Sequence, residues 1–487
     1  MTETKVNRKR RLSPFFRQML AVSGVVMYMI GTGANIAFPG VLLQQLRQPG
    51  SVLKLTLEHE SWIASILGLA LISGILVAPF MMQRLGRRLS NMLSTLPSLA
   101  GWALMVAAKD PTALLISRSL QGFGMGVQAA AAPISIAEYS APRHRGAFLA
   151  TIAFSFATGM LIAHIFGTIL FWRQAALACG SFYVLSLILI SLSPETPPYL
   201  ASVGKFEDCR KTFRWLRGSD DESEKELEVM LNSQKKKTIV SPEVSKIKYY
   251  MNIVMSPGFY KPTVIMMFMF VLFQISGMTV VPSYTVPMMN EVSGGHIESY
   301  TSMLMVDIVR FATAVLSCVV VNKFNRRTVL FFGIYVSVVS LLLTSILLYV
   351  RDFGYLPEKY KWIPVIPTLV YIFGKTIGIL PIPWAIAGEI FPLAYRSLGS
   401  GISGMFLSLM FFVVVKTAPT SFRQIGVKGT FCLYGLCIAL CGAFLYYLLP
   451  ETKGKTLYEI ECHFKGVKDT KGNVEEKDRM LEKVEEG

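Results

Sequence analysis

This sequence of 487 residues has little charge and few of the residues that carry out catalysis. Only 16% of its residues are charged, whereas soluble domains are about 25% charged. Its five histidines and seven cysteines show no spacing typical of a metal site, and no cluster of nucleophile, histidine and acid stands out. These absences argue against an enzyme and against a metal or other cofactor. The cysteines lie mostly in apolar runs, so we expect free thiols and no disulfide.

Long apolar runs stand in place of the missing charge. The apolar fraction is 52% and the mean hydropathy is +0.48. A run of about 20 apolar residues is long enough to cross a bilayer as a helix. We therefore expect an all-α membrane protein in a lipid bilayer, with twelve transmembrane helices at 18–40, 61–82, 89–108, 111–134, 146–170, 175–193, 262–288, 300–321, 328–350, 363–388, 397–417 and 428–449.

The net charge of +17 is distributed as in a membrane protein and does not indicate nucleic-acid binding. Basic clusters precede the first apolar run and follow the second, fourth and eighth, whereas the connections on the other side are short and less basic. An excess of Lys and Arg marks the cytoplasmic side of a membrane. We therefore expect both termini in the cytoplasm and no nucleic-acid partner. The clusters are Lys5, Arg8, Lys9, Arg10 and Arg11; Arg84, Arg87 and Arg88; Arg143 and Arg145; and Lys323, Arg326 and Arg327.

Three motifs occur twice, in the same order and with nearly the same separation. "RLGRR" (84–88) returns as "KFNRR" (323–327), "AEYSAPRHRG" (137–146) returns loosely as "GEIFPLAYRS" (388–397), and Pro-Glu-Thr occurs at 194–196 and 450–452. This pattern indicates two six-helix halves related by duplication, as in the major facilitator fold. The expected parts are a cytoplasmic tail (1–17), a first bundle (18–193), a cytoplasmic linker with short helices (194–261), a second bundle (262–449) and a second cytoplasmic tail (450–487).

The linker carries its own helical signal. "EDCRKTFRWLRG" (207–218) has apolar residues at helical spacing and predicts a short amphipathic helix beneath the bundles. For 219–245, a further helix and a solvated linker fit equally well. The charged tail beyond Phe464 is expected to be disordered.

The repeated motifs place arginines near carboxylates at the cytoplasmic helix ends. The glycine of "RLGRR" permits a tight turn with positive φ, and Asn325, at the same place in the second copy, is the next residue type that tolerates that backbone. We predict a charge network that joins the two halves when the cavity faces outward and breaks when it opens inward. The alternative is that these charges only set the topology. The predicted members are Arg84, Arg87, Arg88, Glu138, Arg145, Glu195, Lys323, Arg326, Arg327, Glu389, Arg396 and Glu451.

Seven motifs spread over nearly the whole chain occur together: "RLGRR", "RSLQGFGMG" (118–126), "PISIAEYSAPRHRG" (133–146), "PETPPYL" (194–200), "QISGM" (274–278), "PIPWAIAGEIFP" (381–392) and "PETKGKTLYEI" (450–460). With these motifs the chain resembles the sugar porter family of the major facilitator superfamily. The segment "LTLEHESWIAS" (55–65), with its short first outer loop, is similar to the facilitated trehalose transporters of insects.

The resemblance implies a facilitative carrier of a sugar, trehalose or a hexose, that works by alternating access. In proton-coupled members of the family, an acidic residue of the first span faces an arginine of the fourth. Arg118 is present here, but 18–40 contains no Asp or Glu, so the resemblance implies uniport without proton coupling. Arg118 can also be a purely structural link between helices. We expect the protein to work as a monomer in the plasma membrane.

The resemblance also implies a sugar site, from which this sequence departs. Trp384 stands at the family's sugar-stacking tryptophan and Gln274 at the second glutamine of the seventh-span motif. Phe273 replaces the first glutamine of that motif, and Thr279 replaces its asparagine. Three further amide positions of the family are occupied here by Ala153, Arg310 and Leu407. The expected contacts are Gln274, Trp384 and Thr279, with Phe273, Arg310 and Lys375 as modifiers of selectivity.

Three charged residues lie deep within predicted spans, at Asp307, Arg310 and Lys375. Each would cost roughly 2.5–3.5 kcal/mol at the bilayer centre, so they should face a cavity or one another. Asp307 and Arg310, one helical turn apart, either form a structural pair or contribute to a positive cavity that suits an anionic or strongly polar solute. His164 is expected only to pack. The alternatives to a sugar carrier are therefore a carrier of another polar or anionic solute and a membrane sensor that does not transport.

Overall fold

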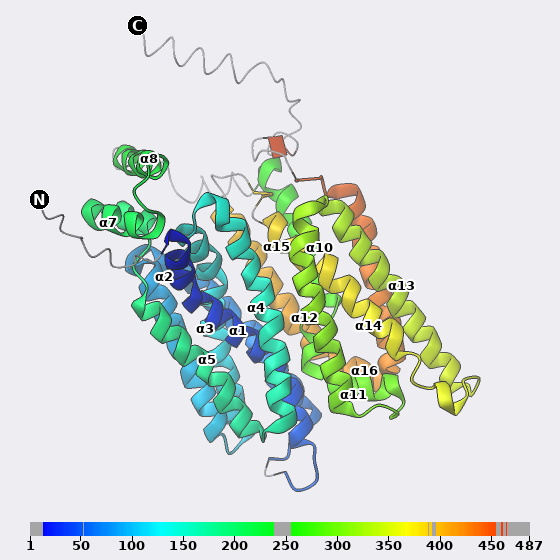
Figure 1. Cartoon of the computed structure of the whole chain (residues 1–487). Helices are drawn as coiled ribbons and strands as arrows, with labels where there is room; N and C mark the ends of the chain where they lie inside the picture. The colour runs from blue at the N-terminus through cyan, green and yellow to red at the C-terminus, as the bar shows by residue number, and fades with distance from the viewer. Residues whose placement is uncertain are drawn as a thin grey trace, which may run out of the picture.

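The structure, a computed structural model, describes residues 13–51, 53–237, 255–387, 389–391, 396–453, 459, 460 and 464. These residues form helices and include no strand. Figure 1 shows two bundles of long helices side by side, the first coloured from blue to teal and the second from green to orange. We call the end at which α1 begins and α16 ends the terminal end (upper in Figure 1) and the opposite end the loop end.

The helices follow the order of the predicted spans. The first bundle comprises α1 (Pro14–Leu46), α2 (Leu57–Ala107), α3 (Pro111–Tyr139), α4 (Pro142–Ile169) and α5 (Trp172–Leu192). The linker forms α6 (Pro197–Ser202), α7 (Phe206–Arg217) and α8 (Asp221–Lys237). The second bundle comprises α10 (Pro257–Ile275), α11 (Val280–Ser293), α12 (Ser299–Lys323), α13 (Arg326–Asp352), the short η1 (Glu358–Tyr360), α14 (Val365–Gly374), the π-helical turn η2 (Lys375–Ile379), α15 (Pro381–Ala387) and α16 (Arg396–Leu448).

Two of these helices are long enough to contain two spans each. The 51 residues of α2 and the 53 residues of α16 are interrupted by glycines with positive φ, Gly86 at 87° and Gly426 at 69°. The predicted spans 61–82 and 89–108 lie on either side of Gly86, and 397–417 and 428–449 lie on either side of Gly426. By length and hydropathy, nine helical segments of the described chain could cross a membrane. The count of twelve therefore stays a prediction.

Two predicted spans are not continuous helices. The span 262–288 is broken between α10 and α11, where Gly277 adopts φ 72°. The span 363–388 is interrupted by η2 and continues as α15, which begins at Pro381. Periodicity did not reveal these breaks because the residues on both sides are equally apolar. Interrupted helices are tolerated at membrane depth only where protein or a water-filled cavity surrounds them, and they mark the binding sites of many carriers.

Small residues let the helices of the first bundle approach closely. At Gly159 of α4, a Cβ would lie 1.9 Å from the carbonyl oxygen of Ile30 and 2.8 Å from the backbone nitrogen of Ala34, both in α1. Only hydrogen fits between these backbones. This close approach is the kind of van der Waals packing that holds membrane helices together, since lipid supplies no hydrophobic drive between them.

Replacing Gly159 with leucine is expected to destabilise the first bundle severely. Overpacking typically costs about 1–3 kcal/mol, and here the cost should exceed that range because the obstacle is backbone. Thermal unfolding followed by size-exclusion chromatography of detergent-solubilised protein measures the loss. Gly146→Leu on the same helix is the control, because a Cβ at that position would meet no atom within 4 Å. An equal melting temperature for both variants would contradict the packing argument.

The linker forms a small helical unit at the terminal end of the first bundle (Figure 1). As predicted, 207–218 is largely helical, and α7 buries Cys209, Phe213 and Leu216. The open question about 219–245 is decided in favour of a helix for its first part, α8, while 238–245 lies outside the described residues, as does the tail beyond Phe464. Arg17 and Gln18 of α1 donate hydrogen bonds to the last carbonyls of α7, which tie the unit to the bundle.

Candidate functional site

The first charge cluster holds the kink of α2 at the terminal end. One carboxylate oxygen of Glu195 accepts the backbone N–H groups of Arg87 at 3.0 Å and Arg88 at 3.2 Å, directly after Gly86. The Arg87 guanidinium donates to Glu138, at the end of α3, at 2.8 and 3.1 Å. A carboxylate at a helix start satisfies N–H groups that have no partner within the helix. The first Pro-Glu-Thr motif therefore caps the second part of α2.

The second charge cluster repeats this geometry in the other bundle. Glu451 accepts the backbone N–H groups of Arg326 and Arg327, each at 3.1 Å, where α13 begins. Arg326 donates to Glu389 at 2.6 and 3.1 Å. Burial acts to raise the pKa of Glu451, but four backbone N–H donors outweigh it and lower the pKa below its ordinary value. The motifs repeated in the sequence thus form the same hydrogen bonds in both bundles.

The backbone of the two copies differs at one position. Asn325 has φ −66° and ψ 144°, which is extended backbone, whereas Gly86 is left-handed. The expectation that Asn325 adopts the conformation of Gly86 was wrong. The reason is that α12 ends at Lys323 and α13 begins afresh at Arg326, so the chain passes the corner in an extended conformation and needs no left-handed turn.

The two charge clusters do not join the bundles in this conformation. Each is closed within its own bundle, and at the terminal end no ion pair between described residues connects the two. The predicted network joins the halves only when this end is closed, and here the bundles are parted. Arg84, Arg145 and Lys323 are exposed and form no ion pair with another described residue, and the side chain of Arg396 lies outside the described part of the chain.

The break between α10 and α11 brings predicted site residues together in the second bundle. The side-chain oxygen of Gln274 accepts a hydrogen bond from the hydroxyl of Thr279 at 2.9 Å. The side-chain nitrogen of Lys375, in η2, donates to the carbonyl of Gly277 at 3.0 Å. All three side chains are buried. Donors and acceptors from two interrupted helices thus meet at one place.

Trp384 adds an aromatic surface beside this place. Its ring, on α15, lies 5.8 Å from the ring of Phe270 and 6.1 Å, edge to face, from that of Phe273. Phe273 is buried, but Trp384 is 48% exposed. An exposed indole offers an apolar face with a polar N–H at its edge.

Arg118 is paired with a residue that the sequence analysis did not identify. Its guanidinium donates to the backbone carbonyl of Asn35 at 2.9 Å, to the side-chain oxygen of Asn35, and to Gln121 at 3.0 Å. Asn35 of α1 is therefore the first-span residue that faces the arginine. An amide holds a guanidinium without taking up or releasing a proton. The signal was present in the sequence, since Asn35 is the one amide within the predicted span 18–40 apart from Gln18 at its first position.

A third cluster, formed by His164, Asp307 and Arg310, joins the two bundles. Asp307 and Arg310 pair within α12, which was one of the two alternatives for their spacing, and Arg310 also donates to the sulfur of Met160 in α4 at 3.4 Å. The other oxygen of Asp307 contacts Nδ1 of His164 in α4. The three polar side chains are at most 2% exposed. His164, which was expected only to pack, is therefore a link between the bundles.

Further contacts close the space between the bundles toward the loop end. A Cβ on Gly40 of α1 would lie 2.6 Å from the carbonyl oxygen of Pro282 in α11. Lys416 of α16 donates to the hydroxyl of Ser61 in α2 at 2.8 Å. The hydrophobic core of the first bundle also includes residues of the second, among them Val280, Phe411, Val414 and Val415. The bundles therefore share a packed interface at this end.

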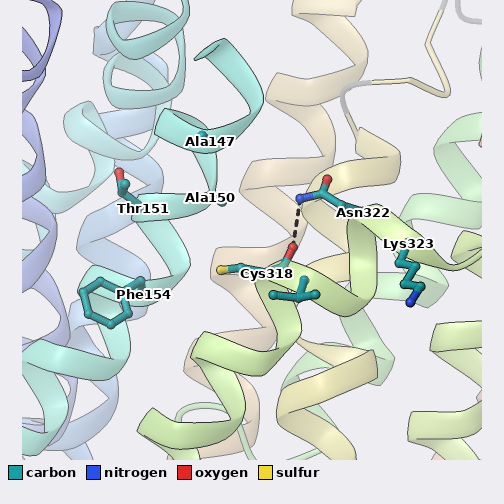
Figure 2. Close-up of a pocket in the computed structure, with 8 residues that line it drawn as sticks. Ala147, Ala150, Thr151, Phe154, Cys318, Asn322 and Lys323 are labelled. Atoms are coloured by element: carbon teal, nitrogen blue, oxygen red, sulfur yellow. Dashed lines mark hydrogen bonds between the residues drawn. The ribbon is translucent and has the colours of Figure 1, made fainter. Parts of the chain in front are cut away.

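Helices α4 and α12, which meet at His164 and Asp307, diverge around a cleft toward the terminal end. The cleft has a volume of about 640 Å³. Figure 2 shows its lining residues, which include Thr151 and Phe154 on α4 and Cys318 on α12. The Asn322 amide at its rim is engaged with the carbonyl of Cys318 at 2.8 Å. None of the six predicted substrate contacts lines this cleft. Its lining is Ala147, Ala150, Thr151, Phe154, Cys318, Val319, Asn322 and Lys323.

Two bundles that touch at one end and part at the other, around interrupted helices with buried polar groups, define a membrane protein of the major facilitator fold. Residues 19–464 match the family model described as "Sugar (and other) transporter". The chain belongs to this family of sugar transporters.

Curated relatives agree with this assignment, and solved structures share the fold. The facilitated trehalose transporter Tret1 of Apis mellifera ligustica is 30% identical over 462 residues, which cover 94% of this chain and 90% of the relative. Tret1 of Aedes aegypti is 26% identical over 451 residues, covering 92% of this chain but 55% of that longer protein. The proton:xylose symporter XylE bound to 6-bromo-6-deoxy-D-glucose has a TM-score of 0.73 at 19% identity, over 93% of this chain and 99% of XylE. The inward open conformation of XylE from E. coli has a TM-score of 0.73 at 18% identity, over 92% of this chain and 99% of that structure.

Proposed function

We propose that this protein is a facilitative carrier that moves a sugar, trehalose or a hexose, across the plasma membrane by alternating access. The observation that carries this proposal is the asymmetric interface, closed toward the loop end and parted toward the terminal end, beside the polar groups at two interrupted helices. Such an interface has two arrangements that expose one site to opposite sides in turn. The family and the printed names of the relatives support a sugar as the solute.

Uniport follows from the environment of Arg118. An acid that faces this arginine would offer a group that can take up and release a proton during the cycle, but Asn35 offers an amide. The excess of Lys and Arg at the terminal end supports cytoplasmic termini, and the conformation described here then opens toward the cytoplasm. We propose a monomer as the working unit, because each chain contains both bundles and the interface between them.

Counterflow in proteoliposomes tests the function. Labelled trehalose, glucose and xylose are offered side by side with a panel of organic anions, and Trp384→Ala is expected to reduce uptake of the transported sugar about tenfold, which corresponds to about 1.4 kcal/mol of lost contact. Trp362→Ala, an exposed tryptophan near η1, is the matched control and should leave uptake unchanged. Flux of an anion without flux of any sugar would replace the sugar proposal, and binding without any flux would indicate a sensor.

A further inference from the structure

The imidazole of His164 faces a hydrogen-bond acceptor at each ring nitrogen. Nδ1 contacts a carboxylate oxygen of Asp307, and Nε2 lies 3.2 Å from the backbone carbonyl oxygen of Ala37. A backbone carbonyl can only accept, and an ionised carboxylate can only accept. A neutral imidazole carries one N–H group and one lone pair, so it can satisfy one of these two oxygens but not both.

A neutral imidazole beside an ionised carboxylate is therefore one proton short of satisfying both contacts. The pair of His164 and Asp307 must hold this additional proton. That proton lies between Nδ1 of His164 and Asp307, as imidazolium beside carboxylate or as imidazole beside carboxylic acid. Without it, a lone pair would face an oxygen in a site that is closed to water, where no solvent relieves the repulsion. Both side chains are at most 1% exposed.

The site lies in the interface that must open during transport. His164 and the Ala37 carbonyl belong to the first bundle, and Asp307 belongs to the second. The rings of Phe154 and Phe311 are 5.3 Å apart on the same two helices. Phe311 lies about one helical turn from Asp307, and Phe154 lies almost three turns from His164, at the lining of the cleft. Together with the contact of Arg310 to Met160, they separate the site from the cleft of Figure 2.

The other charged and titratable groups around the site do not bind and release this proton in place of His164 and Asp307. Arg310 is on the same helix as Asp307 and keeps its charge throughout the ordinary pH range. Lys375 of η2 faces the pair at longer range and donates to a backbone carbonyl, and the hydroxyl of Tyr371 of α14 donates to the carbonyl of Ser276. Among the described residues, neither forms a hydrogen bond with His164. The polar groups of α1 and α11 at this place include the carbonyls of Ile36, Ala37 and Pro282 and the hydroxyl of Ser283.

We propose that His164 and Asp307 form a proton-binding site that couples closure of the loop end to the pH on that side of the membrane. When the loop end closes, the pair takes one proton from the water on that side. When it opens, His164 releases the proton to the same side, while Asp307 stays paired with Arg310. The proton binds and leaves on one side, so no proton crosses the membrane and uniport is preserved.

The sign of the pH effect follows from linkage. An imidazole in water loses its proton near pH 6.5. Below this pH both conformations hold the proton, and the equilibrium between them does not depend on the pair. Above it the closed conformation holds one proton more than the open one, so each further pH unit shifts the equilibrium up to tenfold toward the open loop end.

The accessibility of a cysteine at Ser61 reads out this equilibrium. Ser61 is 6% exposed because Lys416 of the other bundle covers it, and opening of the loop end uncovers it. Ser61→Cys is labelled with a membrane-impermeant maleimide from pH 6 to 8.5, with and without His164→Gln. The labelling rate of Ser61→Cys is divided by the labelling rate of the same variant that also carries His164→Gln. This ratio cancels the titration of the thiol itself and of other groups such as Glu138. We expect this ratio to rise about tenfold between pH 7 and 8.

Two further variants define the outcome. His296→Gln changes an exposed histidine that has no contact across the interface and should behave like the parent. Asp307→Asn removes the other half of the pair and should abolish the pH effect like His164→Gln, with folding checked by size-exclusion chromatography. A ratio that is constant with pH, or the same pH effect in His164→Gln, overturns the proposal. A normal ratio without sugar counterflow would instead refute the transport function and leave the proton site standing.

Discussion

Replacing Gly68 with leucine is expected to abolish sugar flux while the protein still folds. Gly68 of α2 lies against α16 of the other bundle, where a Cβ would be 2.8 Å from the backbone nitrogen of Phe412 and 3.0 Å from the carbonyl oxygen of Ser408. Backbone atoms cannot rotate away as a side-chain end can, so a leucine prevents closure of the loop end. The bundles then remain in the opposite conformation, and the cycle of alternating access stops.

The expected magnitude is large because transport needs both conformations. Shifting a two-state equilibrium from 1:99 to 99:1 takes about 5.5 kcal/mol, which a leucine forced against backbone can supply. Counterflow should fall at least about a hundredfold on this scale, and sugar binding from the loop side should persist. Ser73→Leu adds the same side chain to the exposed face of α2 and should transport normally. If Gly68→Leu retained transport, the closed loop end would not be an obligatory state.

Replacing Arg87 with alanine is expected to weaken the terminal end of the first bundle and to lower flux. The substitution removes two hydrogen bonds to Glu138 and leaves this carboxylate without its cation. Hydrogen bonds to charged groups contribute about 1.5–3 kcal/mol, and the two side chains are 21% and 15% exposed, so screening reduces the effect only partly. Thermal unfolding and counterflow measure both consequences. Arg84→Ala is the matched control, because the Arg84 side chain is exposed and unpaired among the described residues.

The stability defect of Arg87→Ala should depend on pH with a definite sign. Burial raises the pKa of Glu138 above its ordinary value even against the opposing effect of Arg87. Without Arg87 that opposing effect is lost, so Glu138 takes up a proton at still higher pH. Protonation removes the unpaired charge, and the variant should approach the parent protein as the pH falls from 7 to 5. A defect that grows on acidification would contradict this account.

The repeated motifs allowed a specific prediction because their chemistry is local. Each copy brings a basic turn, a helix-end carboxylate and Pro-Glu-Thr to one end of a bundle. The arginines and carboxylates were predicted to meet at these turns without an assignment of pairs, and the structure pairs Arg87 with Glu138 and Arg326 with Glu389. Their role in gating stays a prediction. The capping of backbone N–H groups by Glu195 and Glu451 was not anticipated, because a side chain that accepts from backbone leaves no pattern of charge pairing in the sequence.

The candidate site was only partly predictable. Gln274, Thr279 and Lys375 were named from the sequence and lie together, but the break that assembles them was hidden within an apolar run. His164 and Asp307 are separated by 143 positions, and their contact arises only because α4 and α12 come together between the bundles. The same holds for Asn35 and Arg118.

By itself the amino-acid sequence determined the membrane environment, the helical class, the duplicated halves and the charged turns at their ends. These follow from hydropathy, from backbone hydrogen bonds that must be satisfied within a helix in lipid, and from the spacing of a repeat. The tertiary structure alone decided which end of the bundles is closed, where the helices break, and which buried groups meet across the interface. Such contacts depend on the packing of helices distant in the chain, and the buried cluster of His164, Asp307 and Arg310 exists only once the two bundles have come together.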